Sequence, residues 1–215
     1  SSANGLGDLI PAPDDSEDAG FNTVVVPVGD LLVFKLVVDN YGASPIRTSG
    51  PPPGTVYQQT QLYASLGTAG YQQAGVWRIG MQCETSSDSY PWRWALGDAS
   101  TLDSQYDPAS GNTYLYLPPG KRVVVWGAIR LTELVPTFNP QSCYAGLIHE
   151  GVDISVRNAV VGSRSIQLQS PEQIGKFNTT PETLTEAATE LATDEATASA
   201  TEAPTVEPTE VAATP

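Results

Sequence analysis

The sequence predicts an all-β domain, an antiparallel sandwich or barrel of about seven to nine short strands. Three observations support this fold class. Stretches with a period-two alternation of apolar and polar residues recur through the body of the chain. Clusters of Gly, Pro, Asn and Asp separate these stretches at short intervals. No part of the body has helical periodicity. Spacing alone does not separate a sandwich from a barrel.

The first strands follow from their local patterns. The run TVVVPVG (23–29) is rich in β-branched residues and contains Pro27, which suits an edge strand. The next stretch, 30–40, alternates and ends in the turn residues NYGASP. It predicts two faces, one with Leu32, Phe34, Leu36 and Val38, the other with Val33, Lys35 and Val37.

The middle of the body continues in the same way. A proline-rich loop leads into a strand near 55–62. The stretch GVWRIGMQCE (75–84) predicts a strand that places Trp77, Ile79, Met81 and Cys83 on one face. A short aromatic strand is predicted within YPWRWALG (90–97).

The last strands are separated by clear turns. Residues 112–131 read as a strand, a turn at Pro118–Gly120 and a long strand. Residues 143–156 predict one or two strands broken near Gly151, and 164–169 closes the domain.

Two cysteines, Cys83 and Cys143, lie sixty residues apart in strand-like runs. Neither belongs to a CxxC motif or has a nearby histidine, which favours one structural disulfide over a metal or redox site. Cysteines on non-adjacent strands favour a sandwich, in which a bridge can link the facing sheets.

Composition divides the chain into three parts. Residues 171–215 hold nine acidic residues and one base, a net charge of −8, and contain no Trp, Tyr, Cys or Met. Such a segment cannot bury enough apolar surface to offset its chain entropy. We therefore predict a flexible arm over 1–21, the folded domain over 22–169, and a disordered, acidic Thr/Pro/Glu-rich tail or linker over 170–215.

Several function classes are disfavoured. The formal net charge is −14 and the bases are scattered, whereas a nucleic-acid surface needs clustered Lys and Arg. No stretch approaches eighteen apolar residues, so no membrane-spanning segment is predicted. No GxSxG motif, phosphate-binding glycine loop or HExxH motif occurs, and His149 is the only histidine. We expect a non-enzymatic protein without a cofactor.

Three stretches together carry a family resemblance: VPVGDLLVFKLVVDNYGASPIRTSGPPPG, YPWRWALG, and LPPGKRVVVWGAIRL with the later CYAGLIHEGV. They resemble Ig-like, CARDB-type β-sandwich modules of secreted and cell-surface bacterial proteins. The likeness covers about residues 22–169 and consists mostly of turn and core positions. It implies an Ig-like sandwich that is extracellular or at the cell surface and serves adhesion, display or interaction.

The resemblance leaves the partner open. The leading expectation is a structural or adhesion module that contacts an extracellular protein, a glycan or copies of itself. One alternative is a carbohydrate-binding module with an aromatic platform. Another is a self-assembling subunit of a surface filament or layer, in which TVVVPV pairs with a neighbour's open sheet edge.

The aromatic stretch is the first candidate site. In an extended strand Tyr90, Trp92 and Trp94 would share a face, with Arg93 on the other. Aromatic rings on one face with a polar rim can stack on sugars. The favoured interpretation is that the tryptophans fill the core while Arg93 faces water. Tyr57, Tyr63 and Tyr71, among several glutamines, form a second candidate set.

Weaker candidates complete the set. Asp98, Asp103 and Asp107 lie on one long loop and could offer oxygen ligands to calcium, although their spacing fits no EF-hand loop, so no metal site is predicted. Glu150 and Asp153 are the one carboxylate pair that would suit a hydrolase. Asn178 begins an NTT glycosylation sequon.

Overall fold

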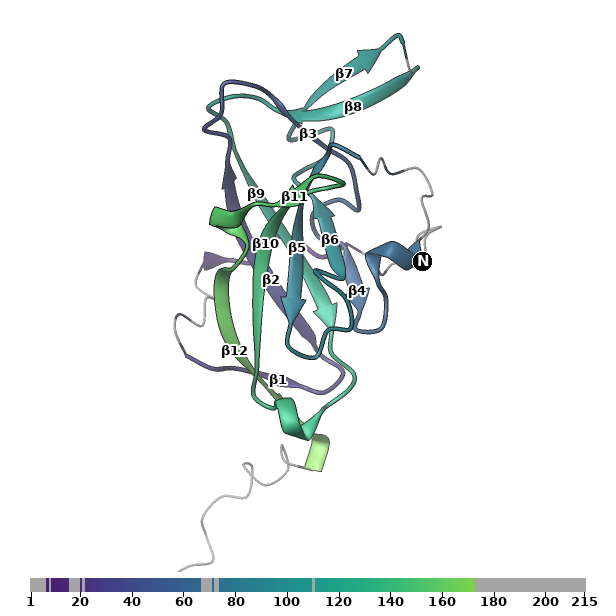
Figure 1. The fold of residues 1–215 in the computed structure, drawn as a ribbon. Coiled ribbons are helices and arrows are strands. Elements are labelled where there is room, and N and C mark those ends of the chain that lie inside the picture. The colour runs from purple at the N-terminus through teal and green to yellow at the C-terminus, as the bar shows by residue number, and fades with distance from the viewer. Residues whose placement is uncertain are drawn as a thin grey trace, which may run out of the picture. The chain divides into compact units, whose positions relative to one another are not determined.

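The computed structural model describes residues 7, 9–15, 20, 22–66, 71, 74–109 and 111–172. Asn178 and nearly all of the predicted tail lie outside these residues. The described part is all-β and has two sheets, which confirms the predicted fold class (Figure 1). Across these residues no helix has the length and apolar character needed to cross a bilayer.

Twelve strands are present in the described residues, more than the seven to nine expected, because several are too short to leave a sequence pattern. They are β1 (Val24–Pro27), β2 (Leu31–Asp39), β3 (Ile46–Thr48), β4 (Val56–Gln58), β5 (Trp77–Cys83), β6 (Trp92–Ala95), β7 (Asp103–Asp107), β8 (Asn112–Leu117), β9 (Arg122–Arg130), β10 (Gln141–His149), β11 (Asp153–Ile154) and β12 (Val161–Gln169).

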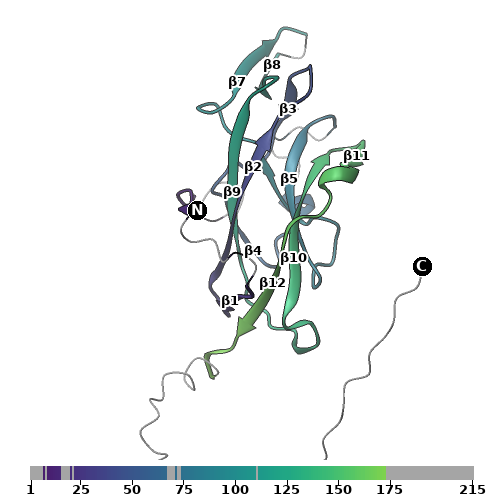
Figure 2. The same ribbon diagram turned by 90° about the vertical axis from the view of Figure 1, so that its left-hand side faces the viewer.

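The larger sheet has the order β1-β12-β10-β5-β3-β8-β7, with β6 on β5 and β11 on β10. The smaller sheet has the order β2-β9-β4. Figure 2 shows the layers side by side, with β2 and β9 in one and β5 and β10 in the other. Most pairs are antiparallel, but β1 runs parallel to β12, β4 to β9 and β3 to β5.

The core lies between the sheets and uses the predicted alternation. Leu32 and Val38 of β2 are buried, as are Ile79, Met81 and Cys83 of β5. Trp94 of β6 is fully buried and lies edge-on to Phe34 and Tyr57, at centroid distances of 4.6 and 4.9 Å. Its indole N–H donates to Thr55 O at 2.9 Å, which satisfies the ring's only polar group.

The predicted disulfide between Cys83 and Cys143 is present and buried. The expectation that it links facing sheets is wrong. Cys83 on β5 and Cys143 on β10 are direct partners in the larger sheet, with Cα atoms 4.1 Å apart. Directly opposed residues in antiparallel strands approach this closely at the pairs that do not exchange backbone hydrogen bonds. A structural disulfide is typical of an oxidising compartment and indicates a protein outside the cytoplasm.

The predicted N-terminal arm does not extend freely where it is described. The backbone N–H of Gly7 donates to Val56 O, and that of Ile10 donates to Gly54 O. The indole of Trp126 donates to Ile10 O at 3.0 Å. Lys35 Nζ then donates to Pro13 O at 2.8 Å. The arm therefore crosses the smaller sheet from β4, past β9, to β2.

Candidate functional site

The predicted aromatic platform is not exposed. Trp92 and Trp94 of β6 are 2% and 0% exposed, and Tyr57 and Tyr63 are 0% and 6% exposed. Tyr57 Oη donates to Arg93 O at 2.7 Å, so its polar end also points into the protein, and burial raises its pKa. The favoured interpretation that Trp92 and Trp94 fill the core is therefore confirmed, and the alternative of a sugar-stacking surface on these four rings is wrong.

Tyr90 lies on the face opposite to that predicted. Its backbone has a positive φ of 46°, which turns the chain just before β6. The ring covers Gly80 of β5 and Gly146 of β10; a Cβ on Gly146 would lie 2.5 Å from Tyr90 Cε1. Its hydroxyl donates to Ala159 O. The Tyr90 ring is therefore buried where it packs on Gly80 and Gly146, and this desolvation raises the pKa of Tyr90.

Arg93 belongs to a cluster of charges and does not stand free on the surface. Its Nη1 atom lies 2.7 Å from Glu150 Oε2, and Arg78 Nη1 lies 2.8 Å from Glu150 Oε1. The guanidinium carbon of Arg78 also lies 4.6 Å from the centroid of the Tyr63 ring. The Arg78 side chain is fully buried and that of Glu150 nearly so. Glu150 is thus held by two arginines, and the structure does not support the pairing of Glu150 with Asp153 as hydrolase acids.

The candidate calcium ligands do not come together. The Asp98 carboxylate accepts hydrogen bonds from Ser100 N and Oγ, which close a local turn. Asp107 Oδ1 accepts from Ala109 N. Asp103 and Asp107 are at opposite ends of β7. Within the described ranges no group of three His, Cys, Asp or Glu side chains is placed to hold a metal ion.

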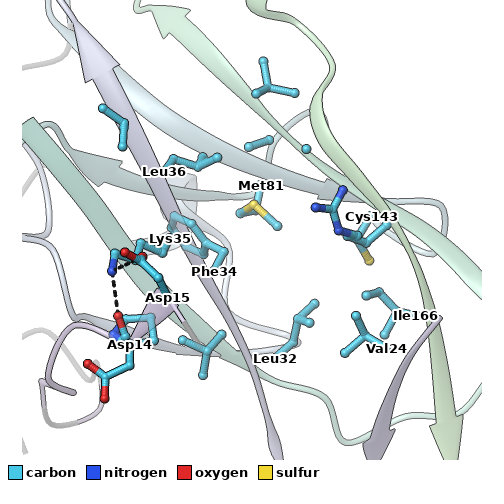
Figure 3. Close-up of a pocket in the computed structure, with 17 residues that line it drawn as sticks. Asp14, Asp15, Val24, Leu32, Phe34, Lys35, Leu36, Met81, Cys143 and Ile166 are labelled. Atoms are coloured by element: carbon cyan, nitrogen blue, oxygen red, sulfur yellow. Dashed lines mark hydrogen bonds and ion pairs between the residues drawn. The ribbon is translucent and has the colours of Figure 1, made fainter. Parts of the chain in front are cut away.

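The strongest candidate site is a groove along the open side of the two sheets. One cavity of about 470 Å³ is lined by β2, the arm, and parts of β1, β5, β10 and β12 (Figure 3). A second cavity of about 290 Å³ continues it along β2. Both include Leu36, Val37, Ala145 and Val161, so they form one continuous groove.

The walls of the groove are two strand edges. β2 is the last strand of the smaller sheet, with β9 on one side and no described strand on the other. β12 pairs with β1 only from Ile166 onward, so the edge of 161–165 that faces away from β10 has no described strand partner. The floor is apolar; Figure 3 shows Leu32, Phe34, Leu36, Met81 and Ile166 around it.

Charged groups stand on the rim. Lys35 Nζ lies 2.7 Å from Asp15 Oδ1, with the Asp15 side chain 94% exposed. Arg164 of β12 lines the same cavity. At the far end Asp39 is bound by Arg122 at 2.6 Å, and this hydrogen bond lowers the pKa of Asp39. Among the described residues, the acidic groups that line the groove are Asp39 and, from the arm, Asp14 and Asp15.

The sequence analysis does not predict this groove. A sequence feature that indicates it lies in residues 30–40, where both faces of the strand carry valine or leucine. Val33 and Val37 lie on the outer face and are 40% and 54% exposed. A strand that is apolar on both faces, yet stands at a sheet edge, is typical of a surface that gains a partner.

Comparison with known proteins adds no assignment. No protein-family model, curated protein or solved structure matches this chain.

Proposed function

We propose that this chain is a non-catalytic interaction module that takes up an extended polypeptide segment beside β2. The observation that carries the proposal is the groove itself, an apolar cavity bounded by edges of β2 and β12 that have no strand partner among the described residues. A strand edge offers backbone donors and acceptors, and the apolar floor offers pockets for alternate side chains. These are the two requirements for binding by strand addition.

The setting is extracellular or at the cell surface. A buried disulfide that joins neighbouring strands and the likeness to CARDB-type modules support this location. Adhesion or display by protein contact fits the groove better than sugar binding, because the aromatic rings proposed for sugars are buried. The segment TVVVPV is already paired with β12 as β1, which leaves the β2 edge as the place for an added strand.

A proline substitution on β2 tests the proposal. Val37 pairs with Val124 of β9. Because the even-numbered residues of β2 exchange hydrogen bonds with β9, the N–H of Val37 points toward the open edge. Val37→Pro removes that donor while keeping the ladder to β9, since proline is tolerated at the solvent-facing positions of edge strands. Val37→Thr keeps both the N–H and the β-branched shape and is the matched control.

The measurement uses random twelve-residue peptides displayed on phage and selected on the full chain. Selected peptides are then titrated by fluorescence anisotropy against the wild type and both variants. We expect Val37→Pro to weaken binding at least about tenfold and Val37→Thr to change it less than about twofold. Equal binding to Val37→Pro, or no selection above background on folded protein, would overturn the proposal.

A further inference from the structure

We infer that the segment bound beside β2 alternates apolar and acidic side chains and places a carboxylate next to Lys35. This inference rests on the proposed function and specifies the chemistry of the segment that the groove binds. It follows from three features of the groove: the direction of the backbone groups of β2, the character of its two faces, and the charges on its rim.

The backbone of β2 points outward at its odd-numbered residues. Asn40 N donates to Lys121 O, and Leu131 N donates to Asp30 O, so even-numbered residues exchange hydrogen bonds with β9. In an antiparallel ladder the alternate residues direct their N–H and C=O groups to the other side. Val33, Lys35 and Val37 therefore present their backbone groups to the groove, over about 17 Å for a five-residue strand.

An added strand must continue the two faces of β2. Its inward side chains would extend the row of Leu32, Phe34 and Leu36 into the apolar cavity, so they must be apolar. Its outward side chains would lie beside Val33, Lys35 and Val37. Side chains directly opposite on neighbouring strands interact, and opposite charges there are favourable. The residue of the bound segment whose side chain lies opposite Lys35 is therefore acidic.

The rim charges favour the same partner. Lys35 and Arg164 bring two positive groups to the cavity in a protein of net charge −14. Among the described residues that line this cavity, the acidic groups are Asp14 and Asp15, which come from the arm and not from the walls. Asp15 is 94% exposed while the Lys35 side chain is 29% exposed, so water screens this ion pair from the Asp15 side and weakens it. An incoming carboxylate can replace Asp15 without leaving a buried charge unpaired.

Three synthetic heptapeptides test the inference by NMR titration of the isotope-labelled full chain. One alternates Val and Glu, one alternates Val and Lys, and the third has the composition of the first without its alternation. We expect the Val/Glu peptide to shift the amide signals of Val33, Lys35 and Val37 and to bind about fivefold more tightly than the other two.

A charge reversal supplies the decisive comparison. Lys35→Glu should invert the preference, so that the Val/Lys peptide binds more tightly than the Val/Glu peptide. Lys121→Glu, in a turn outside the groove lining, is the matched control and should keep the wild-type preference. Lys35 is partly exposed and Lys121 is exposed, so the two sheets should keep their fold in both variants. Lys35→Glu also removes the hydrogen bond to Pro13 O, so the NMR spectrum of each variant is used to check the arm as well as the sheets.

The outcomes separate the two proposals. If the Val/Glu and Val/Lys peptides perturb β2 equally, strand addition holds and the acidic preference is overturned. If phage-selected peptides also leave β2 unperturbed, both proposals are overturned. If sedimentation shows that the protein alone self-associates and Val37→Pro abolishes the association, the groove receives a second copy, and the acidic partner is overturned.

Discussion

Trp94 of β6 packs directly against the backbone of Gly127 in β9. A Cβ atom at Gly127 would lie 2.5 Å from Cε2 of the indole and 2.9 Å from Cε1 of Phe34. The glycine thus allows the two sheets to approach around the largest fully buried side chain. The tryptophan of the aromatic stretch is therefore a fold element.

Gly127→Ala should destabilise the protein by about 2–3 kcal/mol, because the new methyl group has no space beside a close-packed ring. Chemical denaturation measures the change in the free energy of unfolding. Trp94→Phe in the same chain should relieve part of the overlap, so the two substitutions should not be additive. Full additivity would show that Gly127 and Trp94 are not in contact.

Loss of the disulfide should lower stability by about 2–5 kcal/mol, as for other disulfides of secreted domains. The variant with Cys83→Ala and Cys143→Ala, compared with the wild type in denaturant, gives the value. Because both cysteines are buried, a reductant should react with the bridge only after unfolding. Rapid thiol release from protein with an unchanged native spectrum would contradict this placement.

Glu150→Gln should be strongly destabilising, by about 3–5 kcal/mol, because it leaves Arg78 and Arg93 together without a compensating charge. Asp39→Asn, which breaks the exposed pair with Arg122, is the control and should leave the melting temperature nearly unchanged. Calorimetry measures the melting temperature and the unfolding enthalpy of both variants. An equally small effect in both would mean that the Glu150 cluster is not buried.

Asp98 should titrate below the ordinary range of an aspartate. The hydrogen bond from Ser100 Oγ, followed by weaker contributions from Ser100 N and Thr101, lowers its pKa. A depressed folded pKa stabilises the fold above the unfolded pKa, and this contribution is lost as the pH falls through the folded pKa. In an NMR titration Ser100→Ala should move the Asp98 midpoint upward. Identical Asp98 midpoints in the wild type and in Ser100→Ala would show that the hydrogen bonds from Ser100 do not lower this pKa.

The sequence was most informative where side-chain alternation decides burial. The strand expected over 30–40 is β2, and its two faces are as predicted. The strand, turn and strand expected over 112–131 are β8, the turn and β9. The break near Gly151 separates β10 from β11. In each case the alternation or turn signal lies within one continuous segment, so it does not depend on which strands are neighbours.

Features that depend on strand order could not be predicted. Cys83 and Cys143 are sixty residues apart, and nothing in the spacing shows that β5 and β10 are neighbours in one sheet. The predicted face of Tyr90 is wrong because its positive φ breaks the alternation before β6. The groove itself arises where β2 ends the smaller sheet and where β12 runs beyond its pairing with β1, a property of the assembled fold.

Amide hydrogen exchange along β2 tests the central claim most directly. In the free protein, the amides of Val33, Lys35 and Val37 should exchange rapidly, while those of Leu32, Phe34 and Leu36 should be protected by their bonds to β9. Saturation with a selected peptide should slow exchange at the three odd-numbered positions. Protection at those positions before any peptide is added, or no added protection at saturation, would contradict strand addition at this edge.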